Sequence, residues 1–126
     1  MMTYNIYFLS ASAVTAAICF IHCWFGGRFI AEPLLKARDL HEVPKYTSYY
    51  CWHMVSIMLA VMSGAYLWAG THPAAVELAA LALFLSVAFC GWSLALVVWK
   101  KQSFRELPQW SLFAVAAIAG GLGFVA

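Results

Sequence analysis

The sequence predicts an all-α membrane protein: an antiparallel, up-down bundle of four transmembrane helices with both termini outside. Composition is the first observation behind this prediction, because 65% of the 126 residues are hydrophobic, only 10% are charged and the mean hydropathy is +0.84. A soluble domain is about 45–50% apolar and about 25% charged. A globule of this size buries only roughly 60–70% of the surface that its unfolded chain exposes, so lipid must cover much of the apolar surface.

Four long apolar segments are the second observation. Each reaches or exceeds the roughly 20 residues that cross about 30 Å of hydrocarbon at about 1.5 Å per residue. We therefore expect a single transmembrane domain over residues 1–126, with two inner loops at 28–45 and 100–106. The predicted spans cover residues 4–27, 46–69, 74–99 and 107–126.

The distribution of basic residues is the third observation. All 7 Lys and Arg residues lie in or beside the first and third connections. The positive-inside rule places these connections in the cytoplasm and both termini outside, which means the inner membrane if the host is bacterial. No basic stripe interleaved with aromatic residues appears, so nucleic acid is not an expected partner. The basic residues are Arg28, Lys36, Arg38, Lys45, Lys100, Lys101 and Arg105.

Glycine and proline punctuate the predicted spans. The pair Gly26-Gly27, followed by Pro33, is expected to close or kink the first helix. The second and third spans are joined by a tight turn at residues 70–73, and Pro73 falls near the first helical position of the third span. Pro108 likewise falls near the first helical position of the fourth span.

Each span carries a stripe of small or weakly polar residues at alternating three- and four-residue steps. This spacing keeps the stripe on one side of a helix, and small residues let helix backbones approach in lipid. The stripes are expected to face the bundle interior. They comprise Ser12, Thr15, Cys19, His22 and Gly26; Tyr49, His53, Ser56, Ala60 and Ser63; Ala79, Ala82, Ser86, Cys90 and Ser93; and Ser111, Ala114, Ala117 and Gly121.

Two histidines within the spans are the main candidate site residues. His22, His53 and Cys90 lie about 9, 12 and 15 Å above the inner boundary at about 1.5 Å per residue, so they could meet in one layer, with Tyr49 and Ser56 nearby. Ionisable groups inside a membrane are costly and are functional candidates by default. The imidazoles could ligate haem b, hold a metal with Cys90, contact a quinone or relay a proton. Alternatively, each neutral imidazole is a hydrogen-bonded packing residue.

The remaining candidates give weaker signals. No C-x-x-C pair or H-E-x-x-H motif is present, so neither a disulfide framework nor a recognisable metal motif is predicted. Arg28 and Glu32 are four residues apart and can pair, and together with Arg38 they could bind a polar substrate at the inner interface. A solvated connector lying along that interface is the simpler interpretation of this loop.

The segments HCWFGGRFIAEPLL (22–35) and YYCWHMVS (49–56) resemble a group of small four-span bacterial inner-membrane proteins of unassigned function. The resemblance implies membrane location and no particular activity. We expect a non-catalytic protein whose partners are the lipid bilayer and either further copies of itself or the other subunits of a membrane complex. Two alternatives stay open: a haem-, metal- or quinone-binding redox protein that uses His22 and His53, and a small-molecule enzyme that uses Arg28, Glu32 and Arg38.

Overall fold

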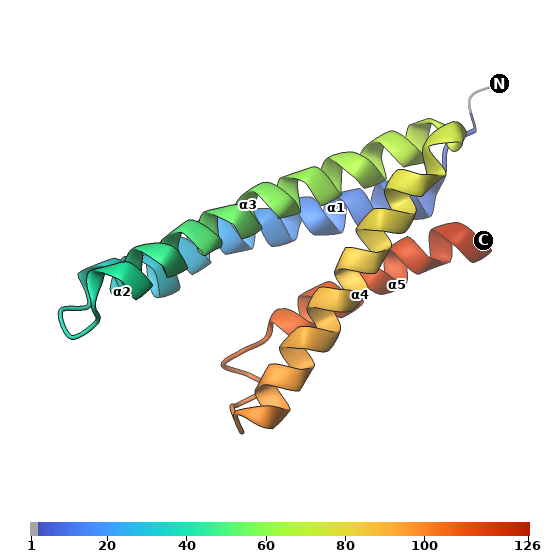
Figure 1. Cartoon of the computed structure of the whole chain (residues 1–126). Helices are drawn as coiled ribbons and strands as arrows, with labels where there is room; N and C mark the ends of the chain where they lie inside the picture. The colour runs from blue at the N-terminus through green and yellow to red at the C-terminus, as the bar shows by residue number, and fades with distance from the viewer. Residues whose placement is uncertain (1–2) are drawn as a thin grey trace.

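The computed structural model describes residues 3–126, and these residues form an all-α bundle (Figure 1). The first helix has three parts that follow one another without a break: α1 (Ile6–Ile21), a π-helix η1 (His22–Ala31) and α2 (Glu32–Lys36). The later elements are α3 (Glu42–Thr71), a short 3₁₀ turn η2 (Pro73–Ala75), α4 (Val76–Trp99) and α5 (Gln109–Val125).

Three of the four helices are long and apolar enough to cross a membrane, as predicted. They cover Ile6–Lys36, Glu42–Thr71 and Pro73–Trp99. The fourth is shorter than expected, because α5 has 17 residues and about 26 Å of length at about 1.5 Å per residue. Residues 107 and 108 of the predicted fourth span belong to the preceding connection, where Pro108 caps the helix.

Of the two alternatives expected at Gly26-Gly27 and Pro33, closing the first helix is wrong, because the helix continues to Lys36; the regular α-helix instead changes to a π-helix over His22–Ala31. A proline inside an α-helix clashes with the carbonyl four residues earlier. Here Pro33 lies in the first turn of α2, directly after the π-helix, and the first turn is the part of an α-helix that tolerates proline. The expected connector at 28–45 therefore shrinks to residues 37–41, and most of the predicted interfacial loop is helical.

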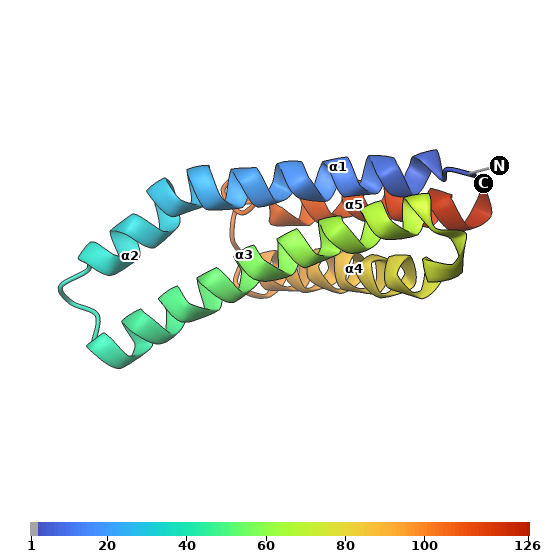
Figure 2. The same cartoon turned by 90° about the horizontal axis from the view of Figure 1, so that it is seen from above.

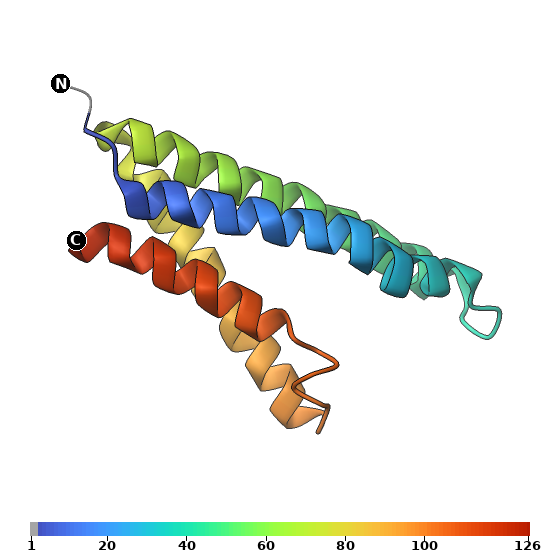
Figure 3. The ribbon, with the colours of Figure 1, turned by 180° about the vertical axis from the view of Figure 1, so that it is seen from behind.

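The helices form two antiparallel pairs, α1 with α3 and α4 with α5 (Figures 1 and 3). The pairs come together at the end that holds both termini and diverge toward the opposite end, where both basic connections lie (Figures 1 and 3). Figure 2 shows from above that the first helix and α3 extend beyond α4 and α5 at that end. The predicted up-down order of four helices is therefore found in a V-shaped bundle, whose divergence the sequence did not predict.

Glycines set the close approach at the terminal end. Tyr66 of α3 is fully buried, and a Cβ added at Gly120 of α5 would lie 2.3 Å from its Oη atom. A Cβ at Gly123 would lie 2.2 Å from Cε1 of Phe8. No larger residue fits at these two positions without displacing a buried ring, so the contacts of α5 with α1 and α3 depend on them.

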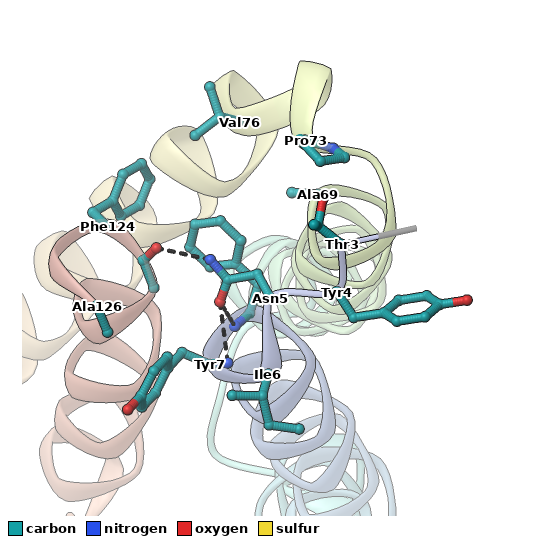
Figure 4. A pocket seen from close by; sticks show the side chains of 12 residues that line it. Thr3, Tyr4, Asn5, Ile6, Tyr7, Ala69, Pro73, Val76, Phe124 and Ala126 are labelled. Atoms are coloured by element: carbon teal, nitrogen blue, oxygen red, sulfur yellow. Dashed lines mark hydrogen bonds between the residues drawn. The ribbon is translucent and has the colours of Figure 1, made fainter. Parts of the chain in front are cut away.

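Asn5 joins three helices at the same end (Figure 4). Its Oδ1 atom caps α1 by accepting the N–H groups of Tyr7 and Phe8 at 3.1 and 3.2 Å. Its Nδ2 atom donates to the carbonyl of Gly123 in α5 at 2.8 Å, and its backbone N–H donates to the carbonyl of Gly70 in α3 at 2.9 Å. These bonds lie beside a pocket of about 460 Å³ between α1, α5 and the turn before α4.

We expect Gly120→Ala to lower the free energy of unfolding by about 1–3 kcal/mol, because the new methyl group overpacks against Tyr66. Gly121→Ala is the matched control, since a Cβ there meets nothing within 4 Å and alanine favours helix. Unfolding in mixed detergent micelles, followed by circular dichroism, measures both. Adding Tyr66→Phe removes the nearest atom and should restore part of the loss; equal stabilities of the two alanine variants would contradict the close approach.

Candidate ligand-binding cleft

A cleft opens where the two helix pairs diverge. It has a volume of about 400 Å³ and lies between the first helix, α3 and the start of α5. Its walls are mainly aromatic and branched apolar side chains, a typical lining for a ligand site. The polar or amphipathic residues that line it are His22, Trp52, Glu106 and Gln109.

A second lobe continues the cleft toward α4. It has a volume of about 250 Å³, and three residues line both lobes: Val55 of α3, and Gln109 and Phe113 of α5. The other residues of the second lobe are apolar except Ser93. The two lobes are therefore adjacent, and they differ in polarity.

His22 is held on the wall of the first lobe by Trp52. Its Nε2 atom lies 3.1 Å from the Trp52 backbone carbonyl, and its ring stacks on the indole with centroids 4.5 Å apart and planes inclined by 22°. A carbonyl oxygen can only accept a hydrogen bond, so Nε2 carries the proton. In the neutral imidazole, Nδ1 then has a lone pair that can accept a further hydrogen bond.

The bond from His22 is the last of a ladder between α1 and α3. Ser12 donates to the carbonyl of Ser63 at 2.8 Å, and the Ser63 hydroxyl donates back to the Ser12 carbonyl at 3.0 Å. The thiol of Cys19 lies 3.7 Å from the Ser56 carbonyl, one step closer to His22. The ladder fixes the rotation of the first helix and so aims His22 at the cleft.

Gly26 leaves an open position between two nitrogen atoms of this wall. A Cβ placed on Gly26 would lie 3.7 Å from Nε1 of Trp52 and 3.9 Å from Nδ1 of His22. Both distances are ordinary van der Waals contacts, so the fold does not require glycine here. All three residues line the cleft. An N–H donor and a lone-pair acceptor therefore flank one unoccupied side-chain position.

His53 does not line the cleft, and the prediction that it faces the interior is wrong. It is exposed on the surface of the chain, where its ring meets those of Tyr49 and Trp52 at centroid distances of 4.5 and 5.0 Å. The buried side of α3 follows Ser56, Leu59, Met62 and Tyr66, and Trp52 precedes this line at the same spacing. That spacing was the signal by which the sequence could have identified Trp52.

Tyr49 and Ser56 belong to the same neighbourhood as His22. The Tyr49 ring is nearly parallel to that of Trp52, at 3° and a centroid distance of 6.3 Å. The Ser56 hydroxyl donates to the Trp52 carbonyl at 3.3 Å, which thus also receives the His22 bond. The structure therefore brings His22, Tyr49, His53 and Ser56 together around Trp52.

Cys90 lies apart from this group. Its thiol donates to the carbonyl of Trp110 at 3.3 Å, between α4 and α5, and it lines neither lobe. Within residues 3–126, no group of three or more His, Cys, Asp or Glu side chains is placed to hold a metal ion. The expected layer of His22, His53 and Cys90 is not formed.

The two imidazoles also do not fit a bis-histidine haem. His22 has its free Nδ1 atom beside Gly26 on the wall of the cleft, whereas His53 is exposed and does not line the cleft. Axial ligation needs two unengaged imidazole nitrogens that face one shared space, and this pair does not provide them.

The inner-loop candidates also lie outside the cleft. Glu32 forms an ion pair with Lys36, and both partners are exposed; Arg28, which was expected to be able to pair with Glu32, adds a smaller attraction to the same carboxylate. Arg28, Glu32 and Arg38 are not among the lining residues of either lobe. Glu106 and Gln109, which sequence patterns did not single out, supply the polar groups nearest the third connection.

No protein family, curated protein or solved structure matches this chain. The resemblance at residues 22–35 and 49–56 stays a prediction, and function is inferred here from the geometry of the cleft.

We expect His22→Ala to lower the free energy of unfolding by about 1–2 kcal/mol, because it removes one interhelical hydrogen bond and a ring stack. His53→Ala should change it by no more than about 0.5 kcal/mol, because the side chain is exposed and its ring contacts, with Tyr49 and Trp52, are within its own helix. Denaturation in mixed micelles compares the two. Equal losses would show that the histidines are equivalent and that the rotation of α3 is wrong.

Proposed function

We propose that this protein is a non-catalytic membrane protein that binds a lipid-soluble, ring-bearing molecule, such as a quinone, in the cleft. The observation that carries the proposal is the open position at Gly26, flanked by Nε1 of Trp52 and Nδ1 of His22. The indole N–H can donate to a ligand carbonyl oxygen, and the imidazole lone pair can accept from a ligand hydroxyl. A quinone offers the first group and its reduced form the second.

The surrounding wall favours a flat ring. Phe25, Phe29 and Phe113 line the same lobe as the two nitrogen atoms, and aromatic pairs gain about 0.5–1.5 kcal/mol beyond their area burial. The lobe's volume of about 400 Å³ falls within the roughly 300–1,000 Å³ usual for small-molecule sites. A ligand that partitions into lipid can reach this lobe without crossing water.

Membrane orientation forms part of the proposal. Both basic connections lie at the open end of the V, so the positive-inside rule places the cleft in the cytoplasmic half of the bilayer and the termini outside. In a bacterial host this is the inner membrane. Assembly with further copies or with other membrane subunits is compatible with the proposal, because the cleft lies within one chain.

We expect Gly26→Ala to weaken binding of a decyl-substituted benzoquinone by about tenfold, because its methyl group takes up part of the space through which a ligand oxygen would approach the two nitrogen atoms. The fold should tolerate this change, since the nearest atoms are 3.7 Å from the new Cβ. Gly64→Ala on α3 is the matched control, because a Cβ there meets nothing within 4 Å. Equilibrium dialysis of the detergent-purified proteins gives the dissociation constants.

Two results of that dialysis would contradict the proposal. One is the absence of saturable binding to the wild-type protein. The other is equal affinity of the wild type, Gly26→Ala and Gly64→Ala, because binding would then occur away from the cleft.

Orientation is tested separately with a membrane-impermeant maleimide on intact spheroplasts. We expect His72→Cys, in the turn between α3 and α4, to be labelled without lysis. Gln102→Cys, in the basic connection before α5, should be labelled only after lysis. The reverse pattern would place the basic connections outside.

A further inference from the structure

We infer that the second lobe of the cleft holds the hydrocarbon tail of the same ligand, so that the ligand is a head-and-tail molecule with its ring near Gly26. This inference rests on the proposed function, and it adds the tail as a second element of recognition. Its first basis is adjacency, because Val55, Gln109 and Phe113 line both lobes. The tail of a molecule bound in the first lobe therefore has to pass only these shared side chains to enter the second.

The first lobe has polar groups that suit a ligand's ring, whereas the second lobe is apolar and suits a hydrocarbon tail. The first lobe contains a histidine, an indole N–H, a carboxylate and a carboxamide. The second is lined by apolar side chains apart from Ser93 and the shared Gln109, and it contains no charged residue. Burial of hydrocarbon is favourable in such a lobe, whereas a polar group there would lose hydrogen bonds.

The exposure of the lobe's walls gives the tail a route to lipid. Val97 forms a buried wall at 1% exposure, whereas Trp92, one turn and a half earlier on α4, is 62% exposed. The lobe therefore runs from the interior of the α4–α5 pair to the outer surface of α4. A tail longer than the lobe would pass Trp92 into the bilayer. The site therefore restricts the size of the ring more than the length of the tail.

The test compares two probes, a tail-less dimethoxy-methyl-benzoquinone and the same ring with a decyl tail. For the wild-type protein we expect the decyl probe to bind at least about tenfold more tightly. Leu96→Trp fills the second lobe and should reduce this ratio to about twofold or less, while the tail-less probe binds as in the wild type. Leu81→Trp is the matched control, because Leu81 is 57% exposed on the same helix and lines neither lobe.

Comparing ratios removes the effect of detergent, because tail partitioning into micelles is the same for every variant. If both probes bind and Leu96→Trp keeps the tenfold ratio, the tail lies elsewhere and the inference is overturned while the proposed function stands. If the wild type binds neither probe, the proposed function fails as well. Loss of the ratio in both tryptophan variants would also overturn the inference, since Leu81 is outside the cleft.

A photoreactive tail keeps the inference testable if Leu96→Trp does not fold. The wild-type protein is irradiated with a quinone that carries a diazirine on its tail, and the labelled peptides are identified by mass spectrometry. We expect labelling within residues 89–97 of α4, the stretch that contributes Phe89, Trp92, Ser93, Leu96 and Val97 to the second lobe. Labelling confined to the first helix or to the outer surface of α3 would contradict the inference.

Discussion

The close approach of the helices at the terminal end is the constraint on which the rest of the structure depends. In lipid there is no hydrophobic drive to bring helices together, so association relies on packing and on interhelical hydrogen bonds. This end provides both. Gly120 and Gly123 admit the rings of Tyr66 and Phe8 between backbones, and Asn5 bonds to α3 and α5 while capping α1. Because these contacts gather at one end, the opposite end is free to diverge, and the cleft is the direct result of that asymmetry.

The two pairs stay intact where they separate from each other, for different reasons. Along α1 and α3, side chains of Ser12, Cys19 and His22 reach backbone carbonyls on the facing helix. Between α4 and α5, Cys90 bonds to the Trp110 carbonyl and the rings of Phe89 and Phe113 meet edge to face. Each pair thus forms one wall of the cleft. The π-helix lies in the first wall, where its residues supply much of the lining, in keeping with the frequent occurrence of π-helical turns at functional sites.

The sequence predicted the helices well and their rotation less well. Hydropathy alone located three long apolar helices, because length and composition decide membrane insertion. The rotation of α3 about its axis was inferred from the polarity of its residues, and this criterion placed His53 in the interior. In the structure it is Trp52 that faces the first helix. In lipid the interior is distinguished by close packing more than by polarity, as the buried Leu59, Met62 and Tyr66 show. The cleft itself was not predictable, since it arises from the divergence of two pairs, a tertiary property with no local pattern. Glu106 and Gln109 line the cleft only because the two pairs diverge.

The role of His22 is best judged against the other members of its ladder. Ser12 and Cys19 link α1 to carbonyls of α3 with small side chains. Helix packing at the position of His22, the third member of the ladder, therefore needs no larger side chain. A histidine at that step makes the same bond through Nε2 and adds a second nitrogen that helix packing does not use. That nitrogen lies beside the open position at Gly26, on the wall of the cleft. An unsatisfied polar group is costly in the lipid bilayer. A group that donates a hydrogen bond to Nδ1 therefore stabilises this arrangement. The hydroxyl group of a reduced quinone could donate that hydrogen bond, whereas the ladder between the helices uses only Nε2.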